Sequence, residues 1–200
     1  YYQEHPEVKH GLVAIAFTPD EEVGGLARDL DLERFGSPIA YTLDGDYLGY
    51  YEDETFNASA ARITIKGRSV HTGTAKGIMI NAVDIASAFM NLLPKFEKPQ
   101  YTEGREGFFH VVSCNATCEN AVIDLIIRDH DAVQFAHREE YVRKCAEALE
   151  REYGEGNITC EIKETYRNLK EVIDKVPFMI DYLKEAISAC GLEPKSLAFR

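Results

Sequence analysis

The sequence lacks the features that would place this chain in a membrane or on a nucleic acid. None of its apolar runs approaches the roughly 20 residues that span a bilayer, and no signal peptide is recognisable. Its 34 acidic residues outnumber its 22 Lys and Arg residues, the net charge is −12, and no basic stripe stands out. Because nucleic acids and anionic membranes attract basic surfaces, we expect neither as a partner.

The pattern of cysteines does not suggest disulfides. Five cysteines at scattered positions, an odd number, are typical of the reduced thiols of a cytoplasmic protein. Cys114 and Cys118 are the one close pair, and no further zinc ligands accompany them at a suitable spacing. Internal repeats and low-complexity segments are absent as well.

The chain nevertheless has enough apolar residues for a real core. A hydrophobic content of 45% over 200 residues is compatible with one large or two small domains. The chain begins with Tyr1 instead of Met and ends at Arg200 within a predicted strand. We therefore expect an internal fragment of a longer protein.

The hydrophobic pattern divides the chain into three parts. Residues 1–54 contain two apolar segments, 12–17 and 38–43, which predict buried strands of an α/β domain. Residues 55–166 have the order β-α-β-β-α-β, which predicts an inserted α+β ferredoxin-like domain. Residues 167–200 return to α/β, with a helix over 177–190 and the start of a strand at 195.

Acidic residues follow both predicted strands of the first part. Glu21 and Glu22 come just after residues 12–17, and Asp44 follows residues 38–43. If the two strands are neighbours, the three carboxylates converge at one sheet edge, where α/β proteins bind ligands. Such oxygen ligands suit divalent metals, and a free carboxylate beside a metal can act as a base. The alternative is a solvated acidic first turn of a helix.

Several motifs of this sequence resemble those of a known family and occur in that family's order. They resemble the co-catalytic two-zinc exopeptidases, and within them the aminopeptidases that act on tripeptides. The resemblance covers essentially the whole chain. Its strongest motifs are Phe17-Thr18-Pro19-Asp20-Glu21-Glu22-Val23-Gly24, Tyr41-Thr42-Leu43-Asp44-Gly45, and His71-Thr72-Gly73-Thr74-Ala75-Lys76-Gly77 with Asn81; Phe56-Asn57-Ala58, Thr102-Glu103-Gly104 and Ile126-Ile127-Arg128-Asp129 add to them.

The resemblance implies roles for the three acidic residues. Glu21 corresponds to the general base that takes a proton from a metal-bridging water. Glu22 and Asp44 correspond to ligands of the two zinc ions, one each. The family also has a histidine and a bridging aspartate upstream and a last histidine downstream, and none of these is in this sequence. We therefore expect the isolated chain to be inactive and to bind zinc weakly.

The resemblance implies further site residues in the rest of the chain. His71 corresponds to a histidine that stabilises the oxyanion of the tetrahedral intermediate, often in the site of the partner subunit. Asn81, Arg128 and Arg200 correspond to residues that bind the substrate's peptide group or carboxylate. Without the resemblance, Asn81 is a polar residue at a helix start and Arg128 a charge at a strand end. His110 is expected to be packed in its aromatic strand.

The resemblance also implies an organisation and a function. Residues 1–54 and 167–200 correspond to two parts of the catalytic domain, and residues 55–166 to a lid and dimerisation domain. We expect a cytoplasmic homodimer that releases the N-terminal residue of tripeptides. A dipeptidase, a carboxypeptidase, an amino-acid deacylase and an inactive oligomerisation module stay open as alternatives.

Overall fold

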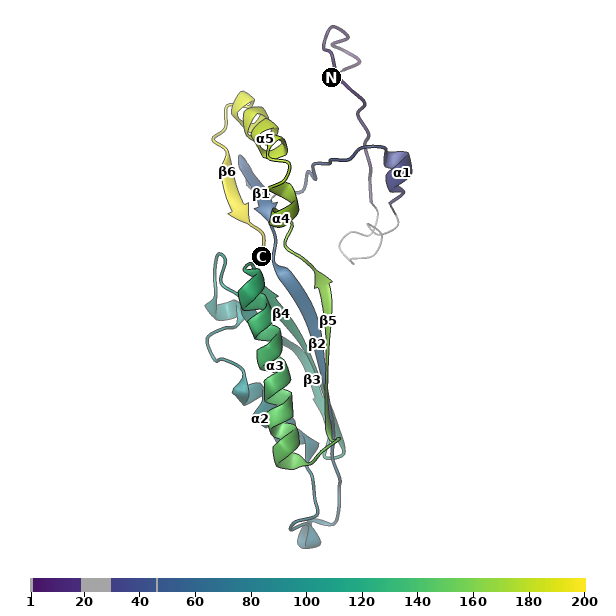
Figure 1. Ribbon diagram of the computed structural model, residues 1–200, viewed down its shortest axis with the longest axis vertical. Coiled ribbons are helices and arrows are strands. Elements are labelled where there is room, and N and C mark those ends of the chain that lie inside the picture. Colours follow the sequence, from purple (N-terminus) through teal and green to yellow (C-terminus); the bar gives the residue numbers. More distant parts are fainter. Residues whose placement is uncertain (1, 19–29, 46) are drawn as a thin grey trace. The chain divides into compact units, whose positions relative to one another are not determined.

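The computed structural model describes residues 2–18, 30–45 and 47–200 (Figure 1). The chain forms two compact units, Tyr1–Asp46 and Tyr47–Arg200. No helix in the described part of the chain is long and apolar enough to cross a membrane.

The first unit has little regular structure among its described residues. Its helix is the single turn α1 (Leu32–Phe35), where Asp31 Oδ1 accepts a hydrogen bond from Arg34 N and Gly36 closes the turn at φ 69°. Residues 12–17 and 38–43 are not strands, so both strand predictions are wrong for this structure. A strand needs a neighbour for its backbone hydrogen bonds, and the described part of this unit provides none. Apolar side chains such as Phe17 (91% exposed) and Leu43 (97%) consequently face solvent.

The second unit contains a short parallel pair of strands. β1 (Tyr50–Glu54) pairs with β6 (Lys195–Ala198), although 140 residues or more separate them in the sequence. Parallel pairing requires a long crossover. Part of this crossover consists of α4 (Lys170–Ile173) and α5 (Phe178–Ala189), which confirms the predicted helix to within one residue at each end.

Between β1 and α4 lies an antiparallel sheet with two helices. The elements β2 (Asn57–Lys66), α2 (Ala82–Leu92), β3 (Phe108–Ala116), β4 (Asn120–Asp129), α3 (Ala132–Tyr153) and β5 (Ile158–Tyr166) follow the predicted order β-α-β-β-α-β. The strand order in the sheet is β3-β4-β2-β5, and every pair is antiparallel. Figure 1 shows both helices on the same face of this sheet.

The core lies between this sheet and its two helices. Alternate residues of β2 and β4 point into it, because side chains alternate between the two faces of a strand. From β2 these are Ala61, Ile63 and Ile65, and from β4 Ile123, Leu125 and Ile127. They pack against buried side chains of the helices, including Ile85, Phe89, Phe135, Val142 and Leu149. Each fully buried Ile or Leu contributes about 1.5–3 kcal/mol, so this core stabilises the strands that carry the candidate site.

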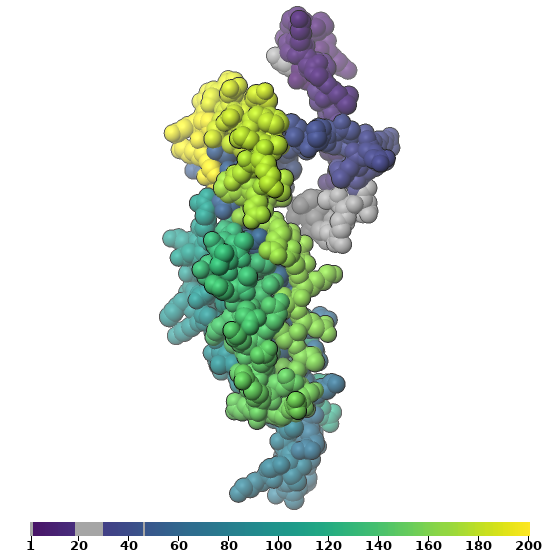
Figure 2. All heavy atoms as spheres, viewed as in Figure 1, coloured from purple at the N-terminus to yellow at the C-terminus, as the bar shows by residue number. Residues whose placement is uncertain are grey.

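Both helices begin at a side-chain cap. Asn81 Oδ1 accepts from Val83 N at the start of α2, and Asp131 Oδ1 accepts from Gln134 N at the start of α3. Such caps satisfy backbone N–H groups that have no partner inside the helix. Figure 2 shows α3, in green, exposed along one side over its whole length.

Candidate functional site

Little of the predicted metal site lies in the described part of the chain. Glu21 and Glu22 are outside the described residues, and Asp44 is exposed in an irregular segment. Among the described residues, no group of three or more His, Cys, Asp or Glu side chains is placed to hold a metal ion. A single carboxylate does not fit a zinc ion, which normally takes at least three protein ligands. The zinc site therefore stays a prediction.

His71 lies in an exposed loop beyond the far end of β2. This loop, residues 67–80, is closed by backbone hydrogen bonds between Arg68 and Ile80 in both directions. His71 caps a short 3₁₀ turn, Thr72–Thr74, and its Nδ1 accepts a hydrogen bond of 3.2 Å from Gly73 N. An Nδ1 that accepts a hydrogen bond carries no proton, so the neutral ring carries its proton on Nε2. His71 thus has a donor at its exposed end.

Gly73 leaves room for the His71 ring in this arrangement. A Cβ at position 73 would lie 3.0 Å from His71 Cε1 and 3.2 Å from its Nδ1. Real Cβ contacts at such distances are crowded, and a larger residue would push the imidazole away. The loop therefore fixes both the proton position and the direction of the His71 ring.

Asn81 lies near the same end of the sheet, directly after Ile80. Its Oδ1 caps α2, which leaves the amide NH₂ as the part of the side chain able to contact a ligand.

Arg128 and Arg200 contact the same aromatic ring. Phe56 is fully buried where β1 runs into β2. The Arg128 guanidinium carbon lies 5.9 Å from the centre of this ring and that of Arg200 lies 5.6 Å from it. The buried Nε of Arg128 has no hydrogen-bond partner among the described residues. Two cations beside one ring, one of them incompletely satisfied, are an arrangement suited to an anion.

Arg200 is already bound by the chain itself. Its Nη1 donates to Gly104 O at 2.9 Å, and also to Glu106 O at 3.5 Å. Its Nη2 donates to Thr102 O at 3.0 Å and to Thr102 Oγ1 at 2.9 Å. Both terminal nitrogens of the guanidinium are therefore engaged.

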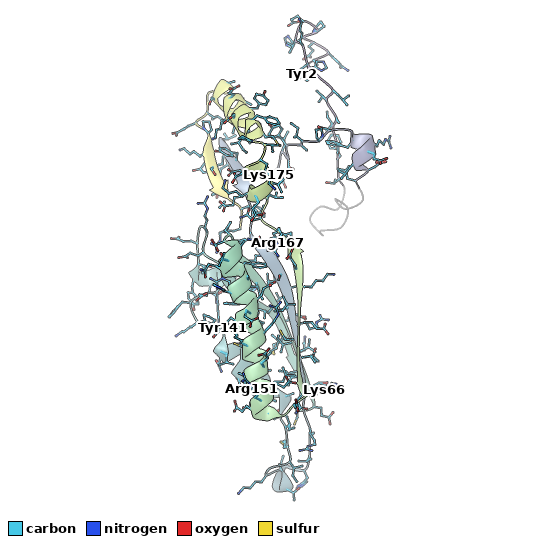
Figure 3. All side chains as sticks on the ribbon, in the orientation of Figure 1. Tyr2, Lys66, Tyr141, Arg151, Arg167 and Lys175 are labelled. Atoms are coloured by element: carbon cyan, nitrogen blue, oxygen red, sulfur yellow. The ribbon has the colours of Figure 1, made fainter. Side chains whose placement is uncertain are left out.

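The structure separates these residues into two groups. Arg128 pairs with Ala58 near the start of β2, whereas His71 and Asn81 lie beyond its other end. The ten residues of β2 place the groups about 30 Å apart, at roughly 3.3 Å per residue. Figure 3 labels residues near both ends of this sheet, Arg167 near the Arg128 end and Lys66 near the His71 end.

A cavity of about 440 Å³ lies at the junction of the two sheets of the second unit. It is lined by Glu54, Asn57, Arg105, His130, Asp131, Ala132, Val133, Asn168, Lys170 and Glu171. Glu54, with only 9% of its side chain exposed, accepts from Arg105 Nε at 2.7 Å. Because a buried carboxylate is costly without a partner, this ion pair fixes the Arg105 loop against β1.

Two asparagines join the strands that enter and leave the antiparallel sheet. Asn57 Nδ2 donates to the carbonyls of Asp129 and His130, and Asn57 Oδ1 accepts from Asn168 N. Asn168 Nδ2 also donates to His130 O, and its Oδ1 accepts from Thr55 N. These bonds satisfy backbone groups where the chain enters the antiparallel sheet at β2 and where it leaves the sheet after β5. We call this region the junction.

His130 is a feature that the sequence analysis did not anticipate. It is only 6% exposed, and its ring lies 4.0 Å from that of Phe56. Its Nε2 lies 3.1 Å from Phe199 O, whereas its Nδ1 has no hydrogen-bond partner among the described residues. Burial lowers the pKa of His130, and the Glu54 carboxylate and the hydrogen bond with Phe199 O oppose this shift. No motif marks this residue, because its partners are distant in the sequence.

His110 also differs from expectation. It was predicted to be packed in its aromatic strand, but its side chain is exposed. The phenylalanines of this strand, Phe108 and Phe109, are buried.

These features define a mixed α/β protein in which an antiparallel sheet with two helices is inserted between two parallel strands. Residues 54–157 match the family described as "Peptidase dimerisation domain". The chain belongs to this family. The matched region includes the whole of β2, α2, β3, β4 and α3.

The chain is also similar to proteins named Peptidase T. It is 47% identical to that of Geobacillus kaustophilus over 195 residues, which is 98% of this chain and 47% of the relative. It is 46% identical to that of Bacillus subtilis over 195 residues, 98% of this chain and 48% of the relative. The chain thus spans about half the length of these relatives.

A solved structure shares the fold. The crystal structure of a tripeptidase from Staphylococcus aureus aligns with a TM-score of 0.78 at 18% sequence identity, over 98% of this chain and 52% of that one.

Proposed function

We propose that this chain is part of a metallo-aminopeptidase that releases the N-terminal residue of tripeptides. The observation that carries the proposal is the 44–47% identity to proteins named Peptidase T over nearly the whole chain. The described site supports it: a histidine donor lies in an exposed loop, and arginines suited to a carboxylate lie at the junction. In this proposal residues 1–54 and 167–200 belong to the catalytic domain, and residues 55–166 form a ferredoxin-like lid.

The proposed roles follow the chemistry of each side chain. Glu22 and Asp44 would each hold one zinc ion, which when bound would lower the pKa of water and so supply a nucleophile at neutral pH. Glu21 would take the proton from that water. His71 Nε2 donates to the oxyanion, a contact worth about 2.7–4 kcal/mol in comparable sites. Arg200 and Arg128 bind the substrate's carboxylate or peptide group, and Asn81 does so in the site that its neighbour His71 serves.

The proposal is tested with the full-length protein that contains this chain. We expect it to cleave tripeptides, to lose activity with a chelator, and to regain it with zinc. Glu21→Gln should abolish cleavage while zinc content, measured by mass spectrometry, stays unchanged. Comparable rates on dipeptides or acetylated amino acids would instead favour a related hydrolase. Activity that is indifferent to the chelator would contradict the metal mechanism.

We further propose a homodimer formed through the edge strand β3. β5, at the other edge, carries Glu161, Lys163 and Glu164, charges of the kind that prevent edge-to-edge pairing. β3 carries no charged residue, and its Val112 is 57% exposed.

The β3 interface is tested by light scattering on the full-length protein. We expect a dimer that Val112→Lys converts to a monomer, while Glu161→Arg on β5, the matched control, leaves it dimeric. A monomeric wild type at micromolar concentration would overturn the proposal.

The five cysteines are free. We propose a cytoplasmic location, which cell fractionation tests.

A further inference from the structure

Arg200 cannot offer both terminal nitrogens to a carboxylate while it holds its present partners. A carboxylate binds arginine best through two parallel hydrogen bonds from two nitrogens of the guanidinium. Here Nη1 is engaged by Gly104 O and Nη2 by both oxygen atoms of Thr102. A substrate carboxylate that takes the two terminal nitrogens must therefore displace the segment Thr102–Glu106.

This segment is held in place by contacts of its own. Thr102 Oγ1 donates to Lys98 O at 3.1 Å, and Glu103 N donates to Glu106 Oε2 at 2.9 Å. The ion pair between Arg105 and Glu54 ties the segment to β1. The acceptors of Arg200 are thus presented by an ordered loop.

We propose that the segment Thr102–Glu106 is an intramolecular competitor for the substrate carboxylate at Arg200. The inference rests on the proposed role of Arg200 in carboxylate binding. The loop offers only neutral oxygen atoms, whereas a carboxylate adds an opposite charge and can accept two parallel hydrogen bonds from the guanidinium. A peptide with a free carboxylate displaces the loop, and a peptide that lacks one does not. Thr102 is therefore a specificity-determining residue.

The size of the effect follows from the population of the free guanidinium. When only a fraction of the protein is competent to bind, the apparent affinity falls by that fraction. One hydrogen bond contributes about 0.5–1.5 kcal/mol net, which corresponds to a roughly two- to tenfold change. Loss of the Thr102 hydroxyl should therefore lower the KM for peptide acids by about two- to tenfold, with kcat little changed.

The experiment compares Thr102→Val with Thr102→Ser in the full-length protein. Valine keeps the shape of threonine without the hydroxyl, and serine keeps the hydroxyl, so serine is the matched control. Each variant is assayed on trialanine and on trialanine amide. We expect Thr102→Val to lower KM for the acid only, and Thr102→Ser to behave as wild type. An unchanged or raised KM for the acid in Thr102→Val would overturn the competitor role.

Arg200→Ala separates failure of this inference from failure of the proposed function. If Arg200 binds the carboxylate, this variant raises KM for trialanine and leaves that for the amide unchanged. If Arg200→Ala gives this result but Thr102→Val leaves KM for trialanine unchanged, only the competition by the loop is refuted. If Arg200→Ala affects acid and amide alike, the role of Arg200 is wrong and the competition with it. No cleavage of either peptide by the wild type would refute the tripeptidase function itself.

Hydrogen exchange supplies a readout that does not depend on the Thr102 variants. In the Glu21→Gln protein, trialanine should speed amide exchange within residues 102–106, because the displaced loop loses its contact with Arg200. Trialanine amide should leave this exchange unchanged. Equal protection with both ligands, at concentrations where trialanine binding is measured by calorimetry, would contradict displacement.

Discussion

His71 and Arg200 are too far apart to act on one tripeptide within a single chain. The ten residues of β2 separate the His71 end of the sheet from the Arg200 end by about 30 Å. An extended tripeptide is only about 10 Å long, at roughly 3.3–3.6 Å per residue. If both residues serve one site, His71 must come from the partner subunit. Two inactive variants should then complement each other.

The perturbation pairs Glu21→Gln with His71→Ala in full-length protein carrying two different tags. Each variant alone forms defective homodimers, and His71→Ala alone should lose about 10²–10³ in kcat. In a mixed dimer, the subunit with intact Glu21 receives the intact His71 of its partner. One of the two sites is then complete, so purified mixed dimers should show about half the wild-type kcat, or about a quarter in an unfractionated random mixture.

The assay measures tripeptide cleavage by dimers purified sequentially on both tags. Glu21→Gln paired with Asp44→Ala is the matched control, because both residues are proposed for the same part of one site. That pair should recover no activity. Equal yields and unfolding midpoints of the mixed dimers would exclude a difference in folding.

Mixed dimers of Glu21→Gln and His71→Ala that stay below about 1% of wild-type kcat would refute the shared site, since a loss of at least about 10² is expected when His71 acts within its own chain. Activity near half the wild-type value would instead exclude a His71 that acts within its own chain. A large closure of one chain on itself could not produce this activity, because neither chain of the mixed dimer carries both Glu21 and His71.

Three further predictions concern the junction and its supports. Asn57→Ala leaves three backbone partners unsatisfied and should lower the free energy of unfolding, measured by urea titration, by about 3 kcal/mol or more. Asn81→Ala, at an exposed cap, should lower it by only about 1 kcal/mol. Equal losses would contradict the structural role of Asn57 at the junction. Gly107→Ala should also destabilise, because its Cβ would lie 2.1 Å from Asp129 Oδ2 within the Asp129–Arg138 ion pair; an unchanged unfolding midpoint would refute this. Burial lowers the pKa of His130, so below about pH 6.5 the unfolded chain binds more protons than the folded chain. The free energy of unfolding should therefore decrease as the pH is lowered below this value, and it should decrease less in His130→Gln. Parallel pH profiles of the two proteins would contradict the lowered pKa.

The antiparallel sheet was predictable because its signals are local. Ala61, Ile63 and Ile65 alternate with polar residues, and this alternation specifies both the strand and its buried face. The long helix was equally clear, because Asp131 caps it and apolar residues recur at three- and four-residue spacing. In such segments the sequence pattern and the tertiary packing favour the same structure.

The apolar segments 12–17 and 38–43 show where this reasoning fails. Their composition is typical of strands, but a strand exists only when another strand takes its backbone hydrogen bonds. The described residues of the first unit contain no such neighbour, and apolar composition alone therefore gave a wrong prediction there. In contrast β1, which the sequence hardly distinguishes, is a strand because β6 pairs with it.

The contacts of the junction could not be predicted from any motif, because they join segments that are distant in the sequence. Phe56, His130 and Arg200 come from three segments that are distant in the sequence, and only the fold brings them together. The family resemblance identified Arg200 as a residue that binds a carboxylate. It gave no indication that Thr102 and Gly104 accept hydrogen bonds from the Arg200 guanidinium. The loop that binds Arg200 is tied through Arg105 to Glu54 on β1, and β1 pairs with β6, two residues before Arg200. Displacement of the loop by a carboxylate would therefore act on both sheets at once, which couples the choice of substrate to the junction of the two sheets.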